Sequence, residues 1–180
     1  MTYRLIPHPD FPPRAVHRVE ADIHVREADH LVLTYQVYGA VPLLPRPASG
    51  VRADDLWKAT CFELFLRGWN GEGYVEFNFS PSSRWAAYGF DAYRDGMRKL
   101  PMRTTPMIEA SEPENGAAFT LRADLDWFGV DGQTFQTNLA AVIEERDGTK
   151  SFWALAHSAG KPDFHDPACF VLELPAAKGS

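Results

Sequence analysis

The chain has 180 residues, of which 45% are hydrophobic and 23% are charged, a composition typical of globular proteins. A chain of this length can bury about 70% of its unfolded surface around one core. The formal net charge of −6, with no basic run, argues against binding to nucleic acid, which requires clustered Lys and Arg. We therefore expect a single domain, residues 1–180, that has no nucleic-acid partner.

The N-terminal segment and the short apolar runs lead us to expect a soluble, cytoplasmic protein. Residues 1–13 contain no apolar stretch of the kind found in signal peptides, and no apolar run is long enough to span a bilayer. Cys61 and Cys169 lie in apolar, strand-like runs, where buried free thiols are expected, although a disulfide between them stays open. Without CxxC spacing these two thiols make no zinc site.

Alternation with a period of two residues recurs along the chain, whereas helical periodicity is nearly absent. In residues 31–38, for example, Leu31, Leu33, Tyr35 and Val37 share one face. The predicted strands are residues 16–26, 31–38, 60–69, 74–80, 84–90, 101–110, 117–125, 135–145, 151–155 and 169–174. About ten short strands predict an all-β fold, an antiparallel β-sandwich of the jelly-roll or immunoglobulin-like kind.

The connections are predicted from turn residues. Three prolines make residues 41–50 a loop, and Asp147-Gly148 marks a tight hairpin because Gly adopts positive φ readily. Residues 91–99 form either one helical turn or a long loop. A turn is expected at 114–116, Trp127 is expected to anchor a loop, and the tail 176–180 is expected to fray.

The segment 60–80 predicts a hairpin with two different faces. Pairing its apolar sets places Phe62 opposite Phe79, Leu64 opposite Phe77, and Leu66 opposite Val75. The opposite face then carries Glu63 with Asn78, Phe65 with Glu76, and Arg67 with Tyr74. This polar face is either a solvent-exposed sheet surface or the floor of a binding site for a polyhydroxy ligand.

Three segments carry a resemblance to a known family. Residues 55–66 (DLWKATCFELFL) and 74–81 (YVEFNFSP) resemble the signature strands of DOMON-like domains, in the superfamily of the family 9 carbohydrate-binding modules. Residues 151–155 and 161–165 resemble the bacterial branch grouped with a peptidoglycan-precursor reductase. The match spans most of residues 16–174, and it implies a β-sandwich whose members bind sugars or haem.

The candidate site follows from the polar face and from this resemblance. A small polar ligand, a saccharide first of all, is expected where Trp57, Glu63, Asn78 and Arg84 converge, with Glu76 and Tyr88 on the same face. Trp57 would stack on a sugar ring, Glu63 and Asn78 would bond to hydroxyls, and Arg84 would donate to a ring oxygen or an acidic group. The alternative reading of Trp57 is a plug at the end of the sandwich.

Other functions stay open as alternatives. A haem-binding domain would need a Met ligand from Met97, Met102 or Met107 and a His ligand from His157 or His165. A loop hydrogen-bonded through His165 and its flanking carboxylates is the simpler interpretation of that segment. A protein-interaction module without a small ligand is the third reading. No catalytic motif is present, and the pair Glu63 and Glu76 is the only hint of a glycosidase, so we expect no enzyme and no cofactor.

Overall fold

A computed structural model describes residues 1–27, 30–48, 50–69, 71–112, 118–126 and 134–175. Within these residues the elements are β1 (Thr2–Pro7), β2 (Arg18–Glu27), β3 (His30–Tyr38), η1 (Leu56–Lys58), β4 (Cys61–Gly68), β5 (Tyr74–Phe79), β6 (Trp85–Phe90), β7 (Arg98–Lys99), β8 (Met107–Ser111), β9 (Phe119–Asp126), β10 (Phe135–Glu144), β11 (Lys150–Ala154), η2 (Pro167–Cys169) and β12 (Leu172–Leu174). The expected turn at 114–116, Trp127 and the tail 176–180 lie outside the described residues.

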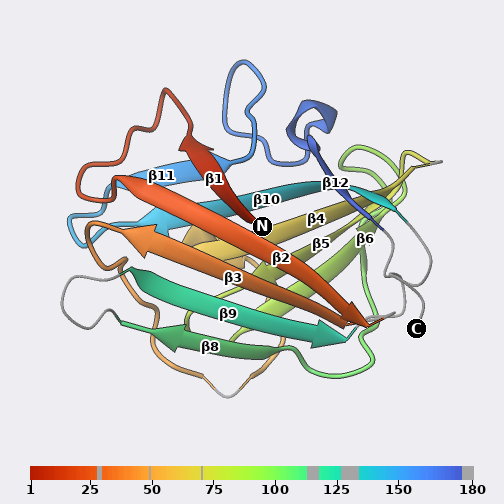
Figure 1. The fold of residues 1–180 in the computed structure, drawn as a ribbon, viewed down its shortest axis with the longest axis horizontal. Coiled ribbons are helices and arrows are strands. Elements are labelled where there is room, and N and C mark those ends of the chain that lie inside the picture. Colours follow the sequence, from red (N-terminus) through yellow and green to blue (C-terminus); the bar gives the residue numbers. More distant parts are fainter. Residues whose placement is uncertain (28–29, 49, 70, 113–117, 127–133, 176–180) are drawn as a thin grey trace.

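The strands form two antiparallel layers, as Figure 1 shows. The first layer has the order β1-β2-β3-β9-β8, and the second has β7-β6-β5-β4-β10-β11, with β12 also paired to β10. Strand β1 joins the layers, because its Thr2–Leu5 part pairs with β2 whereas Ile6 and Pro7 pair with β11. The predicted antiparallel β-sandwich is confirmed.

The inner faces of the two layers make the main core. Leu31, Leu33, Tyr35 and Val37 are buried there, as the alternation in β3 predicts. The second layer contributes the inward residues of β4 and β5, together with Trp85 and Trp153. Burying one large apolar side chain stabilises a fold by about 1.5–3 kcal/mol. Period-two alternation in the strands of both layers determines which side chains point into the core.

The hairpin of β4 and β5 has the predicted register. Its pairs are Phe62–Phe79, Glu63–Asn78, Leu64–Phe77, Phe65–Glu76, Leu66–Val75 and Arg67–Tyr74. The predicted hairpin at Asp147-Gly148 is also present, since Glu144 pairs with Lys150 and Gly148 has φ +86°. Tight pairing of β4 and β5 sends Glu63, Glu76 and Asn78 to the face opposite the main core.

Two strands were not predicted, and two of the predicted strands are reduced by about half. Strand β1 buries only Leu5, so its sequence carries no clear alternation. Strand β7 has two exposed residues, Arg98 and Lys99. The predicted strand 101–110 starts only at Met107, after two prolines that cannot donate to a ladder. The predicted strand 169–174 is reduced to β12 because residues 167–169 form the turn η2.

Cys61 and Cys169 are both buried and both free, as the apolar runs around them predict. No disulfide therefore links β4 to the C-terminal segment. Among the described residues, no helix is long and apolar enough to cross a membrane.

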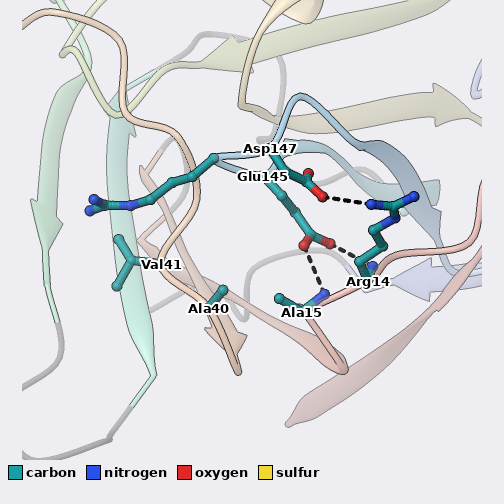
Figure 2. A pocket seen from close by; sticks show the side chains of 7 residues that line it. Arg14, Ala15, Ala40, Val41, Glu145 and Asp147 are labelled. Atoms are coloured by element: carbon teal, nitrogen blue, oxygen red, sulfur yellow. Dashed lines mark hydrogen bonds and ion pairs between the residues drawn. The ribbon is translucent and has the colours of Figure 1, made fainter.

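A hollow of about 400 Å³ lies beside the β10–β11 hairpin, and the carboxylate of Glu145 forms part of its wall. Figure 2 shows this carboxylate directed at the segment that joins β1 to β2. Glu145 Oε1 accepts from the backbone N–H of Arg14 at 2.8 Å and of Val16 at 3.4 Å, and Oε2 accepts from Ala15 at 2.7 Å. Glu145 is 3% exposed, so it holds the two segments together rather than serving a ligand.

We expect Glu145→Gln to destabilise the fold by about 1–3 kcal/mol, because one acceptor becomes an NH₂ group that faces backbone donors. Chemical denaturation would measure the loss. The control is Arg14→Ala, which removes an exposed side chain but keeps the backbone N–H, and should stay within about 0.5 kcal/mol of the wild type. Equal stability of Glu145→Gln and the wild type would contradict this role.

Candidate functional site

A cavity of about 800 Å³ lies over the face of the second layer that points away from the main core. Glu63, Glu76, Asn78 and Tyr88 form its floor. Residues 54–57 line one part of its wall, residues 94 and 97–99 another, and Pro162, Phe164 and His165 a third. Its volume lies within the range of roughly 300–1,000 Å³ that is typical of small-molecule sites.

The structure brings five of the six candidate residues to this cavity. Trp57, Glu63, Glu76, Asn78 and Tyr88 all line it. Arg84 does not line it, and its side chain is exposed. It stands just before the start of β6, beyond the strand positions that face the cavity. The candidate role of Arg84 therefore has no geometric support.

The floor is not a solvated sheet surface. Glu63, Glu76 and Asn78 are 3%, 6% and 2% exposed. A second apolar cluster on the same face, separate from the main core, covers the strands around them and includes Phe65, Phe90 and Phe164, among others. Because buried polar groups need partners, each of the three floor residues has to be accounted for.

Asn78 is held in one orientation by two neighbours. Its Nδ2 donates to Glu76 Oε1 at 2.5 Å, and its Oδ1 accepts from the Cys61 thiol at 3.5 Å. Burial raises the pKa of Cys61 well above its usual range, and the charges of Glu63 and Glu76 raise it further. The thiol therefore stays protonated and can donate, which fixes which end of the amide faces Glu76.

The two floor carboxyls are harder to ionise than exposed ones. Burial raises the pKa of Glu63 well above its usual range and Glu76 raises it further, while Arg94 acts in the opposite direction. Burial also raises the pKa of Glu76 to about 6, although the Asn78 hydrogen bond and the charge of Arg94 lower it. Glu63 Oε1 is buried without a hydrogen-bond partner among the described residues.

His165 faces the floor from the C-terminal segment. Its Nδ1 lies 2.7 Å from the Tyr74 hydroxyl, and its Nε2 lies 3.7 Å from Glu76 Oε2. The backbone N–H of Arg94 donates to the same hydroxyl at 3.2 Å, so the hydroxyl proton is available for Nδ1. Burial and, to a smaller extent, the charge of Arg94 lower the pKa of His165 to about 4, although the charge of Asp163 acts in the opposite direction. The imidazole is therefore neutral near pH 7.

Ion pairs tie the rim of the cavity together. Arg94 Nη2 lies 2.7 Å from Asp163 Oδ1, and the Tyr93 hydroxyl donates to Asp163 Oδ2 at 2.5 Å. On the opposite wall, Asp54 accepts from Tyr88 at 2.7 Å and lies 3.2 Å from Lys99. These contacts link loops that are far apart in sequence, and they support the expected role of the Asp163–His165 segment as a hydrogen-bonded loop.

Trp57 stands at the edge of the cavity on the short turn η1. Asp55, the residue before η1, has the left-handed conformation (φ 63°), which turns the chain toward β4. Trp57 lines the cavity yet remains 52% exposed, and Met97 on the opposite side is 64% exposed. An aromatic ring that is half exposed beside a cavity can stack on a ligand, which a plug buried in the sandwich could not do.

Sequence reasoning did not place several of these residues at the saccharide site, although it named His165 as a possible haem ligand and as part of a hydrogen-bonded loop. Arg94, Phe164 and His165 line the cavity from two irregular segments without any periodicity. The one available signal was the Asp-Phe-His-Asp sequence at 163–166, which places two carboxylates around a histidine.

The residues named for haem lie in several different places. Met97 and His165 line the cavity, but Met102 packs against the main core and Met107 is exposed on β8. His157 Nε2 lies 2.9 Å from the carbonyl oxygen of Ile6. Within the described part of the chain, no group of three or more His, Cys, Asp or Glu side chains is placed to hold a metal ion.

Comparison with solved structures identifies the fold. The chain is similar to a protein from Bacteroides uniformis described as carbohydrate-binding, with a TM-score of 0.68 and 19% identity over 95% of this chain and 84% of that one. It is also similar to a family 9 carbohydrate-binding module from Caldicellulosiruptor kristjanssonii in complex with glucose, with a TM-score of 0.53 and 11% identity over 91% and 78% of the two chains. The chain shares their fold. Its sequence matches no protein-family model and no curated protein.

Glu76→Gln should remove a pH-dependent loss of stability. Because the folded-state pKa of Glu76 is about 6, above the ordinary value of 4.5, its protonated form stabilises the fold at acid pH, and this contribution is lost as the pH rises through 6. Between pH 4.5 and pH 8, the wild type should lose about 2 kcal/mol relative to the variant, whose amide stays neutral. Urea denaturation at both pH values measures the difference.

The titration of His165 has the opposite sign in this range but is present in both proteins, so it largely cancels. Glu63 also titrates in both proteins, and Glu76→Gln removes the part of its raised pKa that the Glu76 charge contributes, which changes the pH dependence in the same direction. The same substitution at exposed Glu109 on β8 is the matched control, and its stability should run parallel to that of the wild type. A constant difference between Glu76→Gln and the wild type at all pH values would contradict the raised pKa.

Proposed function

We propose that this chain is a non-catalytic module that binds a saccharide in the cavity between Trp57 and the floor of β4 and β5. The observation that carries the proposal is the combination of a half-exposed tryptophan with buried carboxylate and amide groups in one cavity. Sugars present apolar C–H faces and a rim of hydroxyls, and this site offers a complement to each.

The polar groups are suited to recognition because their positions are already fixed. Asn78 is held by Cys61 and Glu76, and Tyr88 is held by Asp54. A preorganised site loses less conformational entropy when it binds a ligand. Glu63 can accept a hydrogen bond from a ligand hydroxyl, since its buried Oε1 has no partner among the described residues.

Binding without catalysis is proposed from the sequence, which carries no catalytic motif and offers only the pair Glu63 and Glu76 as a hint of a glycosidase. Both carboxyls are enclosed on the floor, 3% and 6% exposed, a placement that suits them to bind a ligand group from below.

We also propose that the chain is a distant member of the DOMON-like group, within the bacterial branch grouped with a peptidoglycan-precursor reductase. The segments that carry the resemblance are those that build the site: residues 55–66 provide η1 and β4, and residues 74–81 provide β5. The shared fold with a family 9 carbohydrate-binding module supports the wider grouping.

Trp57→Ala should abolish binding to any saccharide that a glycan array identifies for the wild type, with at least a tenfold loss of affinity by calorimetry. The reason is the loss of the ring on which the sugar stacks. Because Trp57 is 52% exposed, the free energy of unfolding should change by less than about 1 kcal/mol.

Two controls accompany this variant. Trp69→Ala removes a tryptophan that is 61% exposed and does not line the cavity, and it should bind as the wild type does. Arg84→Ala should also bind normally, since Arg84 lies outside the cavity lining. A broad array without any binder to the wild type would overturn the proposed function and would favour a protein-interaction module.

A further inference from the structure

The positively charged side chains that line the cavity are paired with carboxylates other than those of the floor. Each of the three cations in its described lining is already paired with a carboxylate: Arg94 with Asp163 at 2.7 Å, Arg98 with Asp91 at 2.5 Å, and Lys99 with Asp54 at 3.2 Å. The floor carboxyls Glu63 and Glu76 have no Lys or Arg ion-pair partner among the described residues. Arg94 acts on them only through its longer-range field, because its guanidinium is engaged by Asp163.

Glu63 is the floor residue whose carboxyl lacks a hydrogen-bond partner for one of its oxygens among the described residues. It is 97% buried, it lines the cavity, and its Oε1 has no hydrogen-bond partner in the described structure. Its neighbour Glu76 is better satisfied, since Oε1 accepts from Asn78 and Oε2 faces the neutral His165 at 3.7 Å. Tyr35 donates to the backbone oxygen of Glu63 and so does not satisfy the side-chain carboxyl, which lines the cavity.

The kind of ligand group that would satisfy Glu63 follows from electrostatics. A hydroxyl can donate one hydrogen bond, but it cannot compensate the cost of ionising a buried carboxyl. An ammonium group offers three N–H donors and a full positive charge, and charge-assisted hydrogen bonds are about twice as strong as neutral ones. Two neighbouring carboxyls, with every nearby Lys and Arg already paired, favour the ammonium group.

We infer that the cavity selects a saccharide carrying a free amino group, with its ammonium bound to Glu63 and close to Glu76. This inference rests on the proposed saccharide-binding function, and it narrows the ligand to amino sugars that are not N-acetylated. An acetyl group would remove the charge and two of the N–H donors, and a neutral sugar lacks all three.

Binding of an ammonium group to the floor is coupled to the release of a carboxyl proton. At pH 6 an aliphatic amine is protonated, whereas the floor carboxyls still hold protons in part because burial raises their pKa. When the ammonium binds, the carboxyl releases its proton to the buffer and the ion pair remains. A neutral sugar hydrogen-bonds to the floor without requiring this release.

The test compares three disaccharides of one linkage that differ only in the substituent on C2 of each ring. They are β-1,4-linked diglucosamine, its N,N′-diacetyl form, and cellobiose, titrated by calorimetry into the full chain at pH 6. Diglucosamine should bind at least tenfold more tightly than either of the others. Repeating the titration in two buffers of different ionisation enthalpy should show proton release for diglucosamine alone.

Glu63→Gln tests the residue. It keeps the shape and an acceptor but not the charge, and it should bring diglucosamine to within threefold of cellobiose and abolish the proton release. Glu109→Gln on β8 is the matched control and should change nothing. If Glu63→Gln fails to fold by circular dichroism, Glu76→Gln takes its place, and it should lower the preference for diglucosamine at least threefold.

The outcomes separate this inference from the proposed function. Equal binding of the three disaccharides, or a preference for diglucosamine that survives Glu63→Gln, would overturn the inference and leave saccharide binding in place. The same holds if none of the three binds while the array identifies a sugar without an amino group. An array with no binder at all would overturn both.

Discussion

Strands β4 and β5 are buried on both faces. One face packs against the first layer in the main core, and the other is covered by the second apolar cluster and by the walls of the cavity. Strands buried on both faces ordinarily read as continuous apolar runs. Here Glu63, Glu76 and Asn78 interrupt the run on the covered face, so their polar atoms must be satisfied by neighbours or by something that enters the cavity.

The protein satisfies most of these atoms through two short chains of hydrogen bonds. The Cys61 thiol donates to Asn78, and Asn78 donates to Glu76. Separately, the Arg94 backbone N–H donates to the Tyr74 hydroxyl, whose proton is available to His165. Each chain fixes the direction of its members, and both end beside the same carboxyl. This order leaves Glu63 Oε1 as the floor acceptor without a hydrogen-bond partner among the described residues.

The sequence was sufficient to predict the strand register and the face on which each side chain lies, because the period-two alternation determines both. Because Phe62, Leu64 and Leu66 alternate against Val75, Phe77 and Phe79, a slip of one residue would bury the polar set in the main core, so the register could be derived. The same logic placed Glu63, Glu76 and Asn78 on one face. It could not show that this face is covered, since the cover comes from residues about 90 positions away, as the contact of Tyr74 with His165 illustrates.

The site residues that the sequence did not predict lie in irregular segments. Arg94 and His165 lie in stretches without periodicity, and only tertiary contacts bring them to the cavity. Arg84 shows the converse. Its position next to β6 suggested a residue within reach of the polar face, yet closeness along a strand does not say where a cavity ends. Strand periodicity predicts the face of a residue but not the shape of the surface above it.

In the proposed site, affinity and discrimination belong to different residues. Stacking on Trp57 depends on the apolar face of a sugar ring, which most hexoses share, so it supplies binding with little selectivity. Glu63 is buried and meets one substituent, and a buried polar group left unpaired penalises every ligand that lacks the matching donor. Because Trp57 is half exposed and Glu63 is fully enclosed, substitutions at the first should change affinity for all ligands together. Substitutions at the second should change the order in which ligands are preferred.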